Sequence, residues 1–310
     1  MYKLITHNDL DGVGCAILAQ AVFGRSGIDI TYCGNPTEAT EVLGELHADL
    51  YDTIYVTDIS FNPDEIRQST LKKIRLFDHH ATALGLREYG QVAVHIGNHA
   101  TCGTELFFKY LSALSVPLRK FEWFVEQIRQ YDTWEWNKEI SHLMCAPYLF
   151  NSLLHLYGRE KFVDFYFNFP PTDFDTAFDA LDIHLVEYED LRAENELKDA
   201  MDNIHFVHLH NYLVGLVFGN YNFSLLGNKI CERYNVDFAM QINLNTRTIQ
   251  VRSTSLYLDL GKIMKDHYMG GGHSKAAGGQ LSRGDWRNVI DDCFEALGFV
   301  VDVKKVGDEK

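Results

Sequence analysis

Short apolar runs alternate with helical patterns through the first half of the chain, and this alternation constrains the fold more than any other feature. The runs with strand character are 2–6, 28–33, 53–57 and 73–77. The stretches that we predict to be helical are 11–24, 37–47 and 63–72, with two more near 102–114 and 118–130. Strands that alternate with helices need crossover connections, which are typical of a mostly parallel sheet. The sequence therefore predicts an α/β domain with a mostly parallel sheet over residues 1–140.

The second half of the chain divides into a helical stretch and a smaller α/β part. Residues 141–204 are rich in Phe, Tyr and Leu and lack strand patterning, and Leu181, Leu185, Tyr188 and Leu191 recur at roughly helical spacing. We expect this stretch to be a helical connector. Strand-like runs return at 212–218, 236–243 and 248–252, with helical stretches at 222–234, 259–268 and 286–297. They indicate a smaller α/β domain over 205–302, followed by a charged tail at 303–310.

Composition and charge narrow the class of protein. The 310 residues are 46% apolar and 13% aromatic, which is enough for two domains with their own cores. The net charge of −15 argues against binding of long nucleic acid, because basic surface supplies much of that affinity. The 6 scattered cysteines contain no CxxC pair and indicate a reduced protein. Neither a signal peptide nor a membrane span is evident, so we expect a cytoplasmic protein that does not bind membranes.

Carboxylates and imidazoles gather where predicted elements end. The clusters are His7-Asn8-Asp9-Leu10-Asp11, Asp58, Asp78-His79-His80 and Asp132. The first three follow predicted strands, and the carboxyl ends of strands are where open α/β sheets build their sites. Several carboxylate oxygens together with imidazole suit a pair of divalent first-row metals. The pattern predicts metal-assisted cleavage of phosphate esters.

Each cluster has a simpler explanation when it is taken alone. Asp11 could cap the helix that follows it, and Asp58 could serve as a turn or cap residue. The aromatic neighbours of Asp132 fit either a plain core or the wall of a substrate site. Two adjacent histidines, His79 and His80, are harder to explain as surface residues. The metal-site hypothesis therefore depends on the four clusters together.

A glycine run marks the second α/β part. Gly270, Gly271 and Gly272 precede His273, and consecutive glycines let backbone amides approach an anion closely. Arg252 ends a predicted strand and can contact phosphate with two parallel hydrogen bonds. The alternatives are a flexible turn with a surface histidine, and a surface ion pair for the arginine.

These residues resemble those of the DHH phosphoesterase family, which is named after the triplet found here at 78–80. The resemblance implies two divalent metal ions, with Mn²⁺ the usual ion and Mg²⁺ or Co²⁺ as alternatives. One ion would be held by His7, Asp9 and Asp58, and the other by Asp11, Asp58, His79 and Asp132. His7 stands two residues before the first aspartate, whereas many relatives place this histidine four before it.

The resemblance also implies roles in catalysis and substrate binding. The catalytic residues would be Asp58, Asp78 and His80, with His80 facing the scissile phosphate. Val251-Arg252-Ser253 and the Gly270–His273 segment are similar to the substrate-binding domain that accompanies the DHH domain in relatives. The substrate-binding residues would be His80, Arg252, Ser253, Gly270, Gly271, Gly272 and His273.

Within the family, the strings here are most similar to those of the bacterial nanoRNase (oligoribonuclease) type, and Tyr131-Asp132-Thr133-Trp134-Glu135-Trp136 is the most specific of them. The implied function is a phosphodiesterase or exoribonuclease that degrades short RNA or DNA oligonucleotides, including nanoRNA and dinucleotides, to nucleoside monophosphates through a two-metal-activated water. The protein would act as a monomer or homodimer. One alternative is a phosphatase acting on 3′-phosphoadenosine 5′-phosphate or another small nucleotide. The other is a nucleotide-binding module that has lost catalysis.

Overall fold

The computed structural model describes residues 1–89, 92–97, 100–114, 117–138, 142–209, 211–255 and 257–282. The chain forms two compact units, Met1–Tyr188 and Glu189–Lys310, and each has its own sheet. No helix among the described residues combines the length and the apolar character that crossing a membrane requires.

The first unit is built on a five-stranded sheet in the order β2-β1-β3-β4-β5, and every neighbouring pair is parallel. Its strands are β1 (Tyr2–His7), β2 (Ile28–Cys33), β3 (Thr53–Thr57), β4 (Ile74–Asp78) and β5 (Ala93–Ile96). The register pairs Thr6 of β1 with Thr57 of β3, and Thr57 with Phe77 of β4. The carboxyl ends of β1, β3 and β4 therefore lie side by side at one edge of the sheet. This confirms the predicted α/β fold with a mostly parallel sheet.

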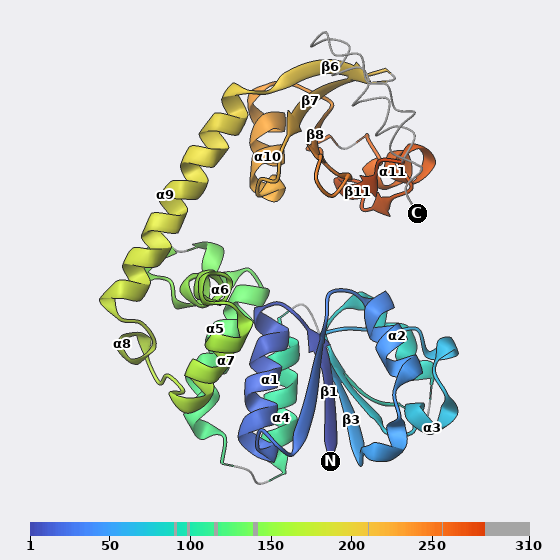
Figure 1. Ribbon diagram of the computed structural model, residues 1–310, viewed down its shortest axis with the longest axis vertical. Helices are drawn as coiled ribbons and strands as arrows, with labels where there is room; N and C mark the ends of the chain where they lie inside the picture. The colour runs from blue at the N-terminus through green and yellow to red at the C-terminus, as the bar shows by residue number, and fades with distance from the viewer. Residues whose placement is uncertain are drawn as a thin grey trace, which may run out of the picture. The chain divides into compact units, whose positions relative to one another are not determined.

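Helices cover both faces of this sheet (Figure 1). One face carries α1 (Leu10–Phe23) and α4 (Gly103–Ala113), and the other carries α2 (Pro36–Glu45) and α3 (Gln68–Leu71). Because successive strand residues point to opposite faces, Leu4 packs in the core beneath α1 while its neighbour Ile5 packs in the core beneath α2. Short 3₁₀ turns in this unit lie at Ala48–Leu50, Pro63–Glu65, Ala81–Glu88, Arg119–Phe121, Glu135–Lys138 and His142–Met144.

Further helices extend the core beneath α1. They are α5 (Glu122–Asp132), α6 (Ala146–Tyr157), α7 (Arg159–Asn168) and α8 (Phe174–Ala177). Phe150 of α6 and Phe162 and Tyr166 of α7 are almost completely buried in the same core as Leu4. The residues after 141 are helical, as expected, but their aromatic side chains build the core of the first unit.

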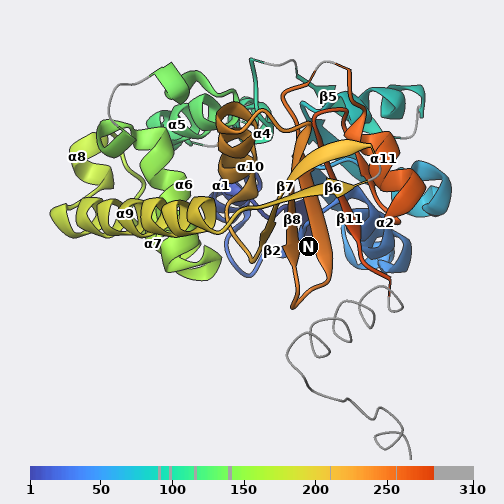
Figure 2. The same cartoon turned by 90° about the horizontal axis from the view of Figure 1, so that it is seen from above.

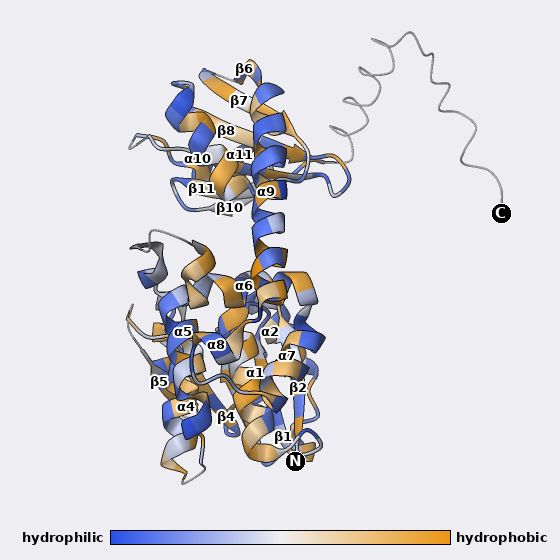
Figure 3. Cartoon of the chain, turned by 90° about the vertical axis from the view of Figure 1, so that its left-hand side faces the viewer, coloured by the Kyte–Doolittle hydropathy of each residue, from blue (hydrophilic) through white to orange (hydrophobic). Residues whose placement is uncertain are grey.

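The last helix of this stretch, α9 (Ala180–Asp202), runs across the boundary between the units. Val186 packs in the first unit, whereas Leu197 and Ala200 pack in a core of the second. Most of the surface of α9 is polar (Figure 3). The division between the units at 188/189 thus differs from the domain boundaries that we predicted at 140 and 204.

The second unit contains a mixed six-stranded sheet in the order β10-β11-β9-β8-β7-β6. Figure 2 labels four of these strands, β6, β7, β8 and β11. Its strands are β6 (His205–Leu209), β7 (Tyr212–Phe218), β8 (Phe238–Asn243), β9 (Thr248–Arg252), β10 (Gly271–Gly272) and β11 (Ala276–Gln280). β7 and β8 are parallel, and the other neighbouring pairs are antiparallel. Ala239 packs with α10 (Phe223–Arg233) while the adjacent Met240 packs with α11 (Leu260–His267), so the two helices cover opposite faces.

Several elements differ from the sequence prediction. β5, β6, β10 and β11 were not predicted. β10 and β11 consist largely of Gly and Ala, which have low strand propensity, whereas β5 and β6 are short runs of four and five residues. The predicted helix at 286–297 and the predicted tail at 303–310 lie outside the described residues.

Candidate metal centre

The edge formed by β1, β3 and β4 carries most of the predicted site residues. His7 is the last residue of β1, Asp58 directly follows β3, and Asp78 is the last residue of β4. Asp132 is the last residue of α5, a helix that packs against α1 and α4. The parallel register and the packing of α5 thus bring together residues that are up to 125 positions apart in the sequence, from His7 to Asp132.

Asp9 and Asp11 have different structural roles at the start of α1. Asp9 is the N-cap: its Oδ1 accepts a hydrogen bond from the Gly12 amide at 3.1 Å, and its Oδ2 lies 2.7 Å from Nδ1 of His7. Asp11 lies inside the first turn and is buried. The helix-cap role that we considered for Asp11 therefore belongs to Asp9.

The N-terminus of α4 holds the Asp11 carboxylate. Its Oδ2 accepts a hydrogen bond from the Gly103 amide at 2.6 Å, and its Oδ1 accepts one from the Thr104 amide at 2.7 Å. A Cβ at position 103 would lie 2.7 Å from the Cβ of Asp58 and 3.0 Å from Oδ2 of Asp11, so only glycine fits there without a shift. Gly103 and Thr104 were not predicted as site residues. The only sequence signal at these positions is the predicted start of a helix near 102, which does not indicate contact with Asp11.

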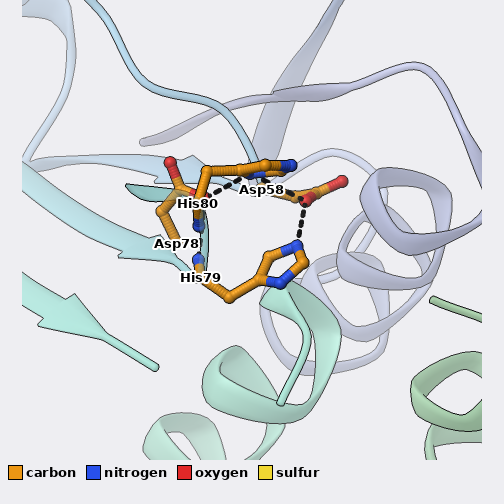
Figure 4. A group of neighbouring side chains, drawn as sticks. All are labelled: Asp58, Asp78, His79 and His80. Atoms are coloured by element: carbon orange, nitrogen blue, oxygen red, sulfur yellow. Dashed lines mark hydrogen bonds and ion pairs between the residues drawn. The ribbon is translucent and has the colours of Figure 1, made fainter. Parts of the chain in front are cut away.

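Asp58 occupies the centre of the cluster. Its φ of 56° places it in the left-handed region, which aspartate tolerates better than most residues. The side chain is buried, with Oδ1 3.4 Å from Nε2 of His79 and 3.9 Å from Nδ1 of His80, and Oδ2 3.8 Å from Nδ1 of His7. One carboxylate therefore faces three imidazoles, and Figure 4 shows two of them, His79 and His80.

Asp78 anchors the two histidines that follow it. Its Oδ1 accepts hydrogen bonds from the amides of His79 at 2.7 Å and His80 at 3.0 Å, and lies 2.7 Å from Nδ1 of the His80 ring (Figure 4). Asp78 is completely buried, whereas the His80 side chain is 50% exposed. This geometry suits Asp78 for orienting His80 and leaves His80 as the member that a ligand can reach.

The side chains fall into groups whose potential ligand atoms all lie within 4.8 Å of one another. One group contains His7, Asp9 and Asp58, and a second contains Asp11, His79 and Asp132. Asp58 also forms a third group with Asp78, His79 and His80. The first group equals one ligand set that the family resemblance implies, and His7 joins it despite its short spacing from Asp9. The second group contains three members of the other implied set and lacks Asp58.

Buried polar atoms without hydrogen bonds test whether these residues fit a metal. In the described part of the chain, such atoms include Oδ2 of Asp58, Oδ2 of Asp132 and Nε2 of His79. Nε2 of His79 lies 3.3 Å from Oδ2 of Asp132 and 3.4 Å from Oδ1 of Asp58, yet it forms no hydrogen bond with either. Buried polar atoms that lack partners are costly, and a cation between them would satisfy them. Carboxylate oxygens with imidazole nitrogens form a donor set that fits a divalent first-row metal.

The electrostatics of the cluster agree with this fit. Burial, followed by the charges of Asp11 and Asp9, raises the pKa of Asp58 well above its usual range. The same causes raise the pKa of Asp132 to about 8. Burial lowers the pKa of His79, while the hydrogen bond with Asp78 raises the pKa of His80. Burial and the neighbouring negative charges favour the protonated forms of Asp58 and Asp132, and a divalent cation would offset both effects and release the protons.

The predicted substrate residues of the second unit have mixed surroundings. Arg252 donates to the Val251 carbonyl at 2.9 Å and to Oγ of Ser224 at 3.0 Å, and it forms no ion pair with a described carboxylate. The alternative of a surface ion pair for Arg252 is therefore wrong for the described residues. Ser253 is buried, and its hydroxyl donates to the Asp237 carbonyl at 2.7 Å, so this hydroxyl is already used within the fold.

The glycine run is more ordered than a flexible turn. Gly271 and Gly272 pair with Gly278 and Ala277 of β11. The Gly270 amide donates to the Met264 carbonyl at 3.1 Å, and the His273 amide donates to the Ala276 carbonyl at 2.8 Å. Those two amides are engaged within the unit and are not free for an anion, while the His273 side chain is exposed.

The comparison with protein-family models finds no match. Among curated proteins, the chain is similar to the oligoribonuclease NrnB of Bacillus subtilis (strain 168), with 29% identity over 321 residues. The similarity covers 97% of this chain and 77% of NrnB.

Solved structures share the fold. The pGpG-specific phosphodiesterase PggH from Vibrio cholerae has a TM-score of 0.53 at 15% identity, covering 96% of this chain and 99% of PggH. The exonuclease RecJ bound to manganese has a TM-score of 0.58 at 13% identity, covering 99% of this chain and 92% of RecJ. The chain is thus similar to NrnB along almost its whole length, and it shares the fold of PggH and RecJ.

Proposed function

We propose that this chain is a metal-dependent phosphodiesterase that degrades short oligonucleotides, nanoRNA and dinucleotides among them, to nucleoside monophosphates. The observation that carries the proposal is the buried carboxylate of Asp58, which faces three imidazoles and belongs to two compact groups of potential ligand atoms. The relative NrnB is named an oligoribonuclease, and PggH is named a pGpG-specific phosphodiesterase. Both names describe enzymes of short nucleic acid, and this supports the substrate class.

We further propose that two divalent cations bind here, with Mn²⁺ as the first candidate and Mg²⁺ or Co²⁺ as alternatives. His7, Asp9 and Asp58 would hold one cation, and Asp11, Asp58, His79 and Asp132 the other. When bound, such a pair lowers the pKa of water and stabilises charge on phosphoryl oxygens. The manganese in the RecJ structure supports the choice of ion.

Other groups of the first unit would orient the metal ligands and contact the phosphate. The α4 amides fix Asp11, because they donate to both of its carboxylate oxygens. Asp78 fixes His80 and raises its pKa, which favours an imidazolium that can donate a hydrogen bond to a phosphoryl oxygen. His80 would thus offset charge on the phosphate that is cleaved.

In the second unit, Arg252 and His273 would hold the substrate's terminal phosphate or nucleotide. The Arg252 guanidinium has five N–H donors, and the described contacts with Val251 and Ser224 engage only part of them. The exposed His273 side chain could add a further hydrogen bond. Gly270, Gly271, Gly272 and Ser253 would shape this region through the backbone, since their described hydrogen bonds and strand pairings lie within the unit.

A panel of labelled substrates tests the function. The purified protein with Mn²⁺ is incubated with 5′- or 3′-labelled RNAs of two, five and twenty-four nucleotides, and with 3′-phosphoadenosine 5′-phosphate. We expect the two shortest RNAs to yield mononucleotides faster than the longest RNA. Release of phosphate from 3′-phosphoadenosine 5′-phosphate alone would favour the small-nucleotide phosphatase instead. Absence of all hydrolysis with Mn²⁺, Mg²⁺ or Co²⁺ would favour the inactive nucleotide-binding module.

We retain two further predictions about the molecule. A monomer or homodimer remains the expected state. A cytoplasmic location is supported by Cys15, Cys33, Cys102 and Cys231, which are buried thiols outside any disulfide.

A further inference from the structure

An exposed tryptophan stands two residues after Asp132. Trp134 is 66% exposed and has a φ of 61°, in the left-handed region. A bulky residue in that region is a true conformational outlier, and such outliers cost free energy and gather at functional sites. Exposure of this large ring also forfeits the gain that burial would give. Neither backbone preference nor core packing explains a tryptophan at this position.

A stack of aromatic rings supports Trp134 from one side. Its ring stacks on Trp136, with centroids 5.8 Å apart and planes 26° apart. Trp136 is only 9% exposed and stacks in turn on Tyr131 at 5.5 Å and 10°. Trp136 also contacts Tyr148 at 5.4 Å. Trp134 is therefore the outermost ring of an ordered stack, and much of its surface is open to solvent.

The turn that carries Trp134 is fixed and starts at the metal centre. Arg129 binds both carboxylate oxygens of Glu135, at 2.8 Å and 3.0 Å, which closes the turn with a two-pronged ion pair. The Trp134 amide donates to the Tyr131 carbonyl at 3.1 Å. Asp132 belongs to the same turn, and its Oδ2 lies 3.3 Å from Nε2 of His79. The exposed ring and the candidate metal ligand are thus held by one short, ordered segment.

We propose that Trp134 is a stacking platform for a nucleobase of the substrate, which makes it a binding residue of the same site. This inference rests on the proposed function. Every base presents a π-face, so an aromatic ring can bind short oligonucleotides whatever their sequence. A short substrate has few phosphates, and the chain carries a net charge of −15, so long-range electrostatic attraction contributes little to its capture. A contact that gains affinity from the base rather than from phosphate suits this chain.

The test compares Trp134→Ala with Trp134→Tyr, on two substrates. One is a ribodinucleotide, and the other is the same sugar–phosphate skeleton without bases. The matched control is Phe169→Ala, since Phe169 is also 66% exposed and lies in the first unit but follows α7. We expect Trp134→Ala to raise KM for the dinucleotide by about tenfold to a hundredfold, the size of one base stack, with kcat, metal content and circular dichroism close to wild type. Trp134→Tyr should recover most of the loss, and Phe169→Ala should behave as wild type.

The base-free substrate separates stacking from a structural effect. Its kinetics should be the same for wild type and Trp134→Ala. Three results for Trp134→Ala would each contradict the stacking role of Trp134. They are an unchanged KM for the dinucleotide, an equal increase in KM for both substrates, and loss of bound metal.

Quenching of tryptophan fluorescence by the dinucleotide distinguishes failure of the platform from failure of the proposed function. A wild-type protein that is inactive but is quenched, with quenching lost in Trp134→Ala, would keep the platform and refute the catalytic proposal. An inactive protein whose quenching is the same in both forms would refute both.

Discussion

At the scale of single residues, the strand ends were the part of the site that sequence could reveal. His7, Asp58 and Asp78 directly end or follow strands, so their chemistry and their placement are both encoded locally. The partners of Asp11 were not visible in this way. Gly103 and Thr104 lie 92 and 93 positions further along, and no short-range pattern links a helix N-terminus to a distant carboxylate.

Asp58→Asn tests the central residue of the cluster. Asparagine has nearly the same shape and also tolerates the left-handed backbone, so the variant should fold normally. It lacks the negative charge that the proposed metal pair shares, and we expect kcat for a dinucleotide to fall by at least about a hundredfold. Steady-state kinetics on a variant with wild-type circular dichroism give the answer. Undiminished hydrolysis would remove Asp58 from the bridging role.

The pKa of Asp132 predicts how stability depends on pH in the metal-free protein. The folded pKa is about 8, whereas an unfolded aspartate titrates near about 3.9. Between these values the folded chain holds a proton that the unfolded chain has lost, so the free energy of unfolding should decrease as pH rises from about 4 to about 8. Added Mn²⁺ should act oppositely and stabilise more at higher pH, because its ligands must be deprotonated.

Thermal melts of the chelated protein at pH 5 and pH 8 measure this dependence. Since other groups also titrate in this range, the informative quantity is the difference between wild type and Asp132→Asn, which should show a flatter pH profile. Identical profiles for the two proteins would contradict the assigned shift.

At the scale of elements, periodicity identified most helices and strands, but not always the face they bury. Leu181, Tyr188 and Leu191 recur at helical spacing and do lie on α9, yet they are 63%, 68% and 55% exposed. The pattern predicted the helix correctly, but a different face of α9 is buried in the folded protein. β10 and β11 escaped prediction because Gly271–Gly272 and Ala276–Gln280 consist largely of residues with low strand propensity, which only cross-strand pairing orders.

The approach of α4 to the cluster gives a prediction about a helix. In Gly103→Ala, the new methyl group would lie 2.7 Å from Cβ of Asp58, so α4 must move away from the site. We expect a loss of stability of about 1–3 kcal/mol and weaker Mn²⁺ binding, because Asp11 would lose its amide donors.

Gly44→Ala in α2 is the matched control for that substitution. Its added Cβ meets its nearest neighbour, the Glu65 carbonyl oxygen, at an ordinary 3.7 Å. A helical Gly→Ala change of this kind should stabilise the protein by about 0.5–1 kcal/mol. Chemical denaturation and Mn²⁺ titration calorimetry of both variants would check the pair, and wild-type metal affinity in Gly103→Ala would contradict the positioning role of α4.

At the scale of the whole molecule, the sequence predicted two α/β parts but not where they divide. The Phe- and Tyr-rich stretch after 141 looked like a connector because it lacks strands. Its aromatic side chains instead complete the core of the first unit, and only α9 crosses the boundary. Composition predicts that many such side chains will be buried, but not which ones or against which neighbours.

Arg252→Ala tests whether the second unit contributes to substrate capture. Arg252 lies in β9 of that unit, outside the predicted metal ligands, so we expect KM for a dinucleotide to rise by about tenfold or more while kcat changes little. Lys in place of Arg252 should restore only part of the affinity, since it cannot donate two parallel hydrogen bonds to phosphate. Kinetics identical to wild type for Arg252→Ala would remove this residue from the substrate site.

Dinucleotide hydrolysis before and after exhaustive chelation tests most directly whether the clustered carboxylates and imidazoles act by binding metal. The assay uses the whole purified chain, with elemental analysis to verify that the metal has been removed. We predict that hydrolysis disappears when the metal is stripped and returns on addition of Mn²⁺. A fully stripped protein that hydrolyses the dinucleotide at its original rate would contradict this account.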